Sequence, residues 1–291
     1  MSFAELRQLV AWAGDEGWNP GLNDARLFWE LDREGFLALA ADDDDSVVAG
    51  GAIIRHSDTF GFMGLFIVDR PYRGRGWGRQ LWVTRRERLL ERLSPGATIG
   101  LDGVDAMVPF YAKGGFQPFT RHRRFQTTPE SKLAFAQRKL VDETTLDAVL
   151  VRPLDATFAP RIATYDRHGF PAPRELFLSR WCEQPDALTR VCFRDDQVVG
   201  YGVMRRCLSG WKVGPLFADS IDIAARIVQS LRDACPDDTL YVDAPDNNPA
   251  ASELCRQMAM QEVFGCVRMY HGPPPQLDHA RIFGITTLEI G

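Results

Sequence analysis

A run of arginines and glycines from Arg73 to Arg79 contains the residue types best suited to binding an anionic ligand. The run is Arg-Gly-Arg-Gly-Trp-Gly-Arg. Its glycines let the backbone approach a ligand closely, and its arginines can donate charge-assisted hydrogen bonds to phosphate oxygens. A helical pattern follows from Leu81 to Leu90, so free N–H groups and the helix dipole would point at the same ligand. The sequence therefore predicts a phosphate-binding turn.

Two common phosphate loops do not match this run. A Walker A loop ends in Gly-Lys-Ser/Thr, whereas Gly78 is followed by Arg79 and Gln80. A dinucleotide fingerprint requires glycine at the position that Arg79 occupies. What remains is R-G-x-G-x-G after an apolar strand that ends at Val68.

The run resembles the pyrophosphate loop of the GNAT superfamily, the acyl-CoA-dependent N-acetyltransferases. A second motif, Tyr-Ala-Lys-Gly-Gly-Phe from Tyr111 to Phe116, resembles the helix end that follows in that family. The stretches Glu16–Gly21 and Ile99–Gly103 resemble one branch of it. The resemblance implies two tandem domains of mixed α/β (α+β) fold, each a bent, mostly antiparallel sheet flanked by helices.

The resemblance also implies roles for individual residues. Tyr111 would protonate the departing CoA thiolate, and Trp18 and Asn19 would border the acceptor pocket. Main-chain groups of one strand would pair with the pantetheine arm as an added strand does, and the loop would hold the pyrophosphate. These CoA-binding residues are Phe66, Ile67, Val68, Arg73, Gly74, Arg75, Gly76, Trp77, Gly78 and Arg79.

An acceptor amine must lose a proton, because an alkyl amine has a pKa near ~10 like that of lysine. Many members of the family place a glutamate on the strand before the loop, but Phe60–Ile67 contains none. Asp102 and Asp105 could instead relay the proton through water, and Glu16 is a further candidate. Asp102 could equally be a turn or helix-capping residue.

Composition limits the remaining possibilities. At about 150 residues per domain, 291 residues suggest two domains. A net charge of −5 argues against nucleic acid as a partner, and we expect neither a membrane span nor a signal peptide. Six cysteines without a C-x-x-C spacing predict no metal site and suit a reducing cytoplasm.

Periodicity predicts the elements that position the motifs. Helical spacing marks Phe3–Ala13, and Asn23 or Asp24 would cap a second helix. Strands are expected at 36–40, 47–55, 60–68 and 97–101, and a short helix carries Tyr111.

The second half of the chain repeats this outline without its chemical residues. Val198–Arg205 echoes Val47–Ile54, and Leu240–Asp246 echoes Ile99–Asp105. Val213–Asp219 replaces the glycine-rich loop, with Asp219 expected to cap a helix over 221–234, and Cys255 stands where Tyr111 does. We therefore predict a GNAT domain with the CoA loop at 1–145 and a degenerate GNAT-like domain at 146–291.

The predicted function is transfer of an acyl group, most readily acetyl from acetyl-CoA as cosubstrate, to a small-molecule or peptide primary amine by direct attack in a ternary complex. The alternative is an acyl-CoA-binding sensor without turnover. The chain is expected to be a monomer with an internal pseudo-dimer, or a homodimer.

Overall fold

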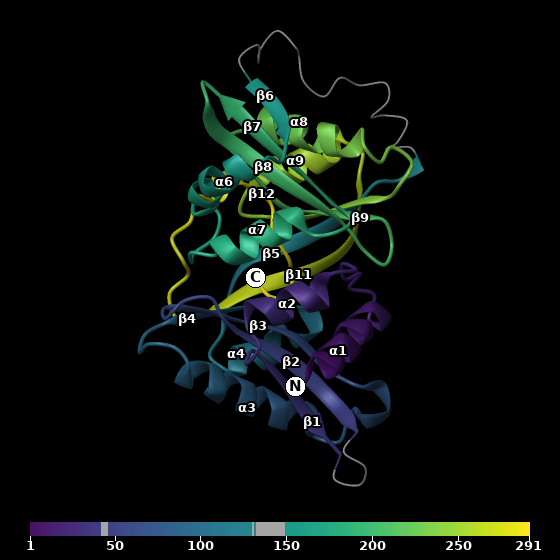
Figure 1. Cartoon of the computed structure of the whole chain (residues 1–291). Helices are drawn as coiled ribbons and strands as arrows, with labels where there is room; N and C mark the ends of the chain where they lie inside the picture. The colour runs from purple at the N-terminus through teal and green to yellow at the C-terminus, as the bar shows by residue number, and fades with distance from the viewer. Residues whose placement is uncertain (42–45, 130, 132–148) are drawn as a thin grey trace. The chain divides into compact units, whose positions relative to one another are not determined.

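A computed structural model describes residues 1–41, 46–129, 131 and 149–291 (Figure 1). The chain forms two compact units. The first comprises Met1–Phe119, Arg268–Pro275 and Leu288–Gly291, and the second comprises Thr120–Val267 and Gln276–Thr287. The domain boundary predicted near residue 145 lies outside the described residues and stays a prediction.

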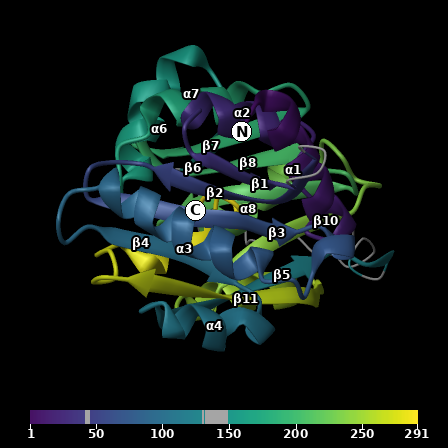
Figure 2. The same ribbon diagram turned by 90° about the horizontal axis from the view of Figure 1, so that it is seen from below.

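The first unit contains strands and helices close to the predicted positions. They are α1 (Phe3–Asp15), α2 (Asp24–Leu31), β1 (Phe36–Ala40), β2 (Val47–Arg55), β3 (Phe60–Val68), η1 (Arg70–Tyr72), α3 (Trp77–Glu91), β4 (Thr98–Gly103), η2 (Asp105–Met107) and α4 (Val108–Lys113). Its sheet has the order β1-β2-β3-β4, followed by the end of β11 (Gln261–His271). The helix α3 crosses one face of β2 and β3 (Figure 2).

The second unit contains the remaining elements. They are β5 (Gln117–Gln126, of which Thr120 onward belongs here), β6 (Val149–Pro153), η4 (Ala156–Phe158), α6 (Ala159–Asp166), α7 (Glu175–Glu183), β7 (Ala187–Arg194), β8 (Gln197–Arg206), β9 (Trp211–Ala218), α8 (Ile221–Arg232), β10 (Leu240–Pro245), α9 (Pro249–Gln257), the start of β11, η5 (His279–Arg281) and β12 (Ile282–Gly284).

The order of elements in the first unit recurs in the second. A pair of helices, three antiparallel strands, a helix, a parallel strand and a short helix follow one another in both. β3 runs parallel to β4, and β9 runs parallel to β10, whereas β1/β2, β2/β3, β7/β8 and β8/β9 are antiparallel. The mixed, mostly antiparallel fold and the repeat are therefore confirmed. Among the described residues, no helix is both long and apolar enough to span a bilayer.

A β-bulge interrupts the pairing of β2 with β3. Ala52 pairs with Gly64 and Gly50 pairs with Ile67, so Leu65 and Phe66 together oppose the single residue Gly51. Leu65 has a φ of 47°, in the left-handed region.

The guanidinium of Arg85, from α3, fills this bulge. The residue is fully buried, and its Nη2 donates to the carbonyls of Ala52 at 2.5 Å and Gly64 at 2.7 Å. It lies 5.0 Å from the centre of the Phe66 ring. A Cβ added to Gly51 would lie 2.5 Å from Arg85 Cζ, which is closer than van der Waals contact allows. Gly51 is therefore needed for the guanidinium to sit against the strand.

The Gly51→Ala substitution should lower the free energy of unfolding by ~1–3 kcal/mol, as expected for an overpacked core. The measurement is urea denaturation of Gly51→Ala, Arg85→Ala and the double variant. Because Arg85→Ala removes the clashing atoms, the two losses should couple, and the double variant should lose less than their sum. Strictly additive losses would contradict this packing.

Candidate active site

The strands β3 and β4 pair for only part of their length. Their parallel register runs from Phe60 opposite Thr98 to Met63 opposite Leu101. No further pairing between the two strands follows in the described part of the chain, although β3 continues to Val68. The main chain of Phe66–Val68, expected to hold a pantetheine arm, thus lies beyond the paired region. A backbone edge of this kind can accept an extended ligand as an additional strand.

The glycine-rich loop connects this edge to α3. Gly74 has a φ of 78° and Gly76 a φ of 90°, both in the left-handed region that favours glycine. Gly76 is the N-cap of α3 and supplies no side-chain hydrogen bond. A Cβ added at Gly78 would be 3.3 Å from the Val68 side chain, so α3 begins directly against β3. The first turn of α3 therefore has no side-chain cap of its own, which leaves it suited to an anionic ligand.

The arginines of the loop do not have equivalent surroundings. Arg73 donates through Nε to the Val68 carbonyl at 2.9 Å and pairs through Nη2 with Glu16 at 2.7 Å. Arg70 contacts the same carboxylate at 3.3 Å and donates to the Asp15 carbonyl at the end of α1. The hydrogen bond from Arg73 lowers the pKa of Glu16. Arg75 and Arg79 are exposed.

Trp18 and Asn19 follow the end of α1 that these arginines hold. Both residues are half-buried. The backbone N–H of Trp18 donates to the Ala13 carbonyl at 2.9 Å, and Asn19 has a left-handed φ of 53°. The chain thus turns sharply at the two residues that were predicted to border the acceptor pocket.

Tyr111 lies on α4 inside an aromatic cluster. Its ring centre is 5.0 Å from that of Trp82, and a Cβ added at Gly103 would lie 2.7 Å from its ring. The ring centres of Trp82 and Phe66 are 6.1 Å apart, so the cluster connects Tyr111 with the end of β3 that does not pair with β4. Burial raises the pKa of Tyr111 to about 12, although the charge of Arg85 opposes this effect. The phenol is therefore protonated at neutral pH and can act as a proton donor.

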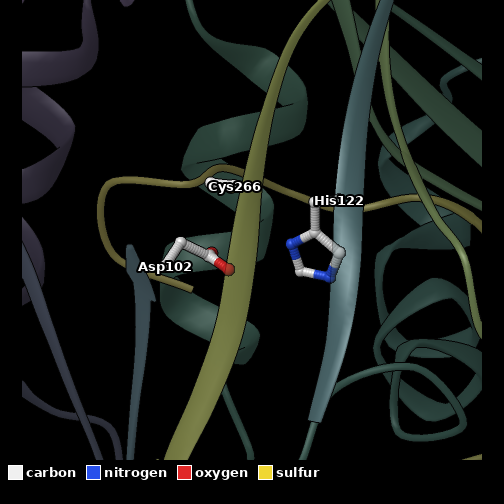
Figure 3. Close-up of side chains that lie close together, drawn as sticks. All are labelled: Asp102, His122 and Cys266. Carbon is white, nitrogen blue, oxygen red and sulfur yellow. The ribbon is translucent and has the colours of Figure 1, made fainter. Parts of the chain in front are cut away.

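Asp102 is engaged by an arginine. Its two carboxylate oxygens accept from Arg268 Nε at 2.9 Å and Arg268 Nη2 at 2.7 Å. Asp102 is a residue of β4 (Figure 3), and η2 has Val104 as its N-cap, so the helix-cap alternative for Asp102 was wrong. Because Gly103 faces Tyr111, strand alternation places Asp102 on the opposite face of β4. Asp105, the other nearby candidate base, is exposed.

In the second unit, the helix start that corresponds to the glycine-rich loop is capped by a side chain of the chain itself. Ser220 caps α8 with its hydroxyl, which accepts from the Ile223 N–H, so the prediction that Asp219 caps this helix was wrong. Asp219 instead accepts from the Tyr165 hydroxyl at 2.7 Å and pairs with Arg281 at 3.2 Å. Cys255, the counterpart of Tyr111, is buried, and burial raises the pKa of its thiol.

The burial of Arg85 was not predicted. Arg85 sits four residues from both Leu81 and Leu89, and all three are buried on α3, so a charge on an apolar stripe was the available signal. The end of the apolar tail, Leu288–Gly291, packs back as part of the first unit.

Comparisons with known proteins match both halves of the chain to one family. The model "Acetyltransferase (GNAT) family" matches residues 3–116, and "Acetyltransferase (GNAT) domain" matches residues 162–284. Holothin acyltransferase from Pseudoalteromonas sp. (strain SANK 73390) is 26% identical over 291 residues, which cover 100% of this chain and 92% of that protein.

Solved structures show the same fold. A putative acetyltransferase from Pyrococcus horikoshii has a TM-score of 0.78 and 20% identity, covering 100% of this chain and 94% of its own. A tandem GNAT protein from the clavulanic acid biosynthesis pathway has a TM-score of 0.65 and 12% identity, covering 94% and 96%.

The two family matches follow one another along the chain, and a relative described as an acyltransferase spans all of it. This chain is therefore an acyltransferase enzyme of the GNAT acetyltransferase family, with two such domains in tandem.

Proposed function

We propose that the first unit transfers an acyl group, most readily acetyl, from CoA to a primary amine by direct attack in a ternary complex. The observation that carries this proposal is the end of β3–β4 pairing at Met63 and Leu101, beside a helix whose N-cap is Gly76. The residues present suit acyl-CoA as the cosubstrate, because an open strand edge and an uncapped helix N-terminus are joined by one short loop.

Each part of the donor would meet a different group. The pyrophosphate would accept from the first N–H groups of α3 and from the exposed side chains of Arg75 and Arg79. The pantetheine amides would pair with the main chain of Phe66–Val68. Arg73 would brace the loop, because its guanidinium already bonds the Val68 carbonyl and Glu16.

The chemical step needs an attacking amine and a proton for the leaving sulfur. A neutral amine attacks the thioester carbonyl, a tetrahedral oxyanion forms, and its collapse breaks the C–S bond and expels the CoA thiolate. The Tyr111 hydroxyl, kept protonated by its burial, would donate the proton to that thiolate.

Two of the predicted bases, Asp102 and Glu16, are poor acceptors for the amine proton. Protonation of Asp102 would break two charge-assisted hydrogen bonds from Arg268. Glu16 is likewise held ionised by Arg73. In this proposal the amine therefore attacks from its neutral fraction and its proton passes to solvent, while Asp102 and Arg268 act as a fixed ion pair. None of the six cysteines takes part in a disulfide in the described part of the chain, which suits the cytoplasm as the compartment.

Thiol release from acetyl-CoA over a panel of primary amines tests the proposal. Amine-dependent release supports the transferase. Calorimetric binding of acetyl-CoA without release from any amine would support the sensor instead and would refute the proposal.

CoA should bind at about one equivalent per chain, and Gly76→Asp should abolish or greatly weaken that binding. The left-handed φ of Gly76 disfavours any side chain, and aspartate adds a negative charge beside the pyrophosphate. Loss of charge-assisted contacts worth ~1.5–3 kcal/mol predicts roughly tenfold to hundredfold weaker binding by calorimetry.

Gly96→Asp is the matched control for that variant. Gly96 also has a left-handed φ, 81°, and open space around its Cβ position, but it lies after α3. Its CoA affinity should stay near wild type. Two equal sites per chain, or full affinity in folded Gly76→Asp, would contradict the loop assignment.

Tyr111→Phe should lower kcat by up to ~10²-fold, the low end for general acid catalysis, because a thiolate leaves tolerably unaided. The affinity for acetyl-CoA should change little, since the ring and its packing on Trp82 remain. Cys255→Ala, at the matching place in the second unit, should leave kcat unchanged. Full turnover in Tyr111→Phe together with loss of turnover in Cys255→Ala would contradict the assignment and would place the active site in the second unit.

The pH profile should rise with the neutral fraction of the amine and show no loss attributable to Tyr111 below about pH 11. Only the protonated phenol donates, and its pKa is raised to about 12, so this contribution disappears as pH rises through about 12. Measuring kcat/KM for a single amine from pH 6 to 10 checks the ascending limb. A descending limb near neutrality would rule out a buried phenol as the acid.

A further inference from the structure

The segment Leu288–Gly291 packs on β3 at the point where β3 leaves β4. A Cβ added to Gly64 would lie 1.8 Å from the Glu289 carbonyl oxygen, so the Glu289 backbone lies directly against Gly64. The Ile290 carbonyl oxygen is 2.8 Å from His56 Nε2. Gly64 immediately follows Met63, the last β3 residue that pairs with β4.

The segment covers the face of the sheet that is opposite α3. Gly51 faces Arg85 of α3, so its neighbours Gly50 and Ala52 face the other way, and Gly50 meets Leu9 of α1. Gly64 is the cross-strand partner of Ala52 and shares that face. Phe62, two residues earlier on β3, contacts Gly291 on the same side.

The residues predicted to border the acceptor pocket follow α1, which packs on this same face of the sheet. Trp18 and Asn19 follow directly from α1, and Asp102 points away from Tyr111. In the proposed function the thioester lies in the gap that opens after Met63, with Tyr111 on the α3 side. An amine must then approach from the opposite side, past the backbone of Glu289.

We propose that the segment Leu288–Gly291 forms a wall of the acceptor site and restricts it to amines that are unbranched next to nitrogen. This inference rests on the proposed function. The segment is built as a fixed wall, because Ile290 is 0% exposed and its carbonyl is held by His56. In this proposal the peptide backbone against Gly64 fills the space that a substituent on the carbon beside the attacking nitrogen would need.

The test compares linear and α-branched primary amines as acceptors with acetyl-CoA as donor. Butylamine and 2-aminobutane form one isomer pair in the panel. The value of kcat/KM is measured for each amine, and the ratio of linear to branched is compared within each pair. The variants are Ile290→Ala, which removes the buried anchor of the wall, and deletion of residues 289–291. Ile290→Ala keeps the chain intact if the deletion variant fails to fold.

Leu93→Ala is the matched control. Leu93 is a buried aliphatic residue that also packs on β3, at Gly61, on the face occupied by α3. The control therefore reports general loss of packing on β3 without loss of the wall.

The ratio of linear to branched kcat/KM should fall at least tenfold in Ile290→Ala, with CoA affinity within twofold of wild type. Leu93→Ala should keep the wild-type ratio. An unchanged ratio in folded, CoA-binding Ile290→Ala, or an equal fall in Leu93→Ala, would overturn the wall. Wild-type protein that binds CoA but acylates no amine would overturn the proposed function itself, and this inference with it.

Discussion

The buried guanidinium of Arg85 is the interaction on which the geometry of the site depends. Before the bulge, Gly61 of β3 faces α3, whereas after it Phe66 and Val68 do. Strand side chains alternate with a period of two, so only an extra residue in β3 can exchange the faces in this way. That exchange brings Phe66 against Trp82, and through Trp82 it connects the strand edge with Tyr111.

The bulge has an energetic cost that Arg85 offsets only in part. The carbonyl oxygens of Ala52 and Gly64 accept hydrogen bonds from its Nη2. Leaving a buried carbonyl unpaired would cost ~1–3 kcal/mol. Its Nε and Nη1, however, have no hydrogen-bond partner among the residues that the structure describes, and desolvation lowers its pKa to about 10. Retention of a charge at such a position points to a requirement for the bulge rather than to a gain in stability.

The sequence predicted most of the elements because local chemistry determines them. Three strands of the first unit, at 36–40, 47–55 and 60–68, have the predicted bounds, since alternating or continuous apolar runs end at turn residues. The loop was visible because Gly74 and Gly76 need a left-handed backbone that glycine favours. The roles of the individual loop residues stay predictions.

Long-range pairing was not predictable in the same way. Glu16 and Arg73 are far apart in the sequence, as are Asp102 and Arg268, and neither pair has a local signature. Asp219 was wrongly expected to cap α8 because it and Ser220 are both good N-caps at adjacent positions. Only the contact of Asp219 with Tyr165 and Arg281 decides between them.

The two units differ in their suitability for an anionic ligand because different residues cap two equivalent helices, α3 and α8. At α8, the Ser220 hydroxyl already accepts a backbone N–H, and the Asp219 carboxylate adds negative charge beside it. At α3, Gly76 offers no acceptor, so the positive end of the helix dipole stays available. Because Glu16 already balances much of the charge of Arg73, selectivity for an anion at α3 would come chiefly from backbone N–H groups and from Arg75 and Arg79. If the proposed function holds, such a site would recognise the shape of a pyrophosphate more than its net charge, which fits a protein whose overall charge is negative.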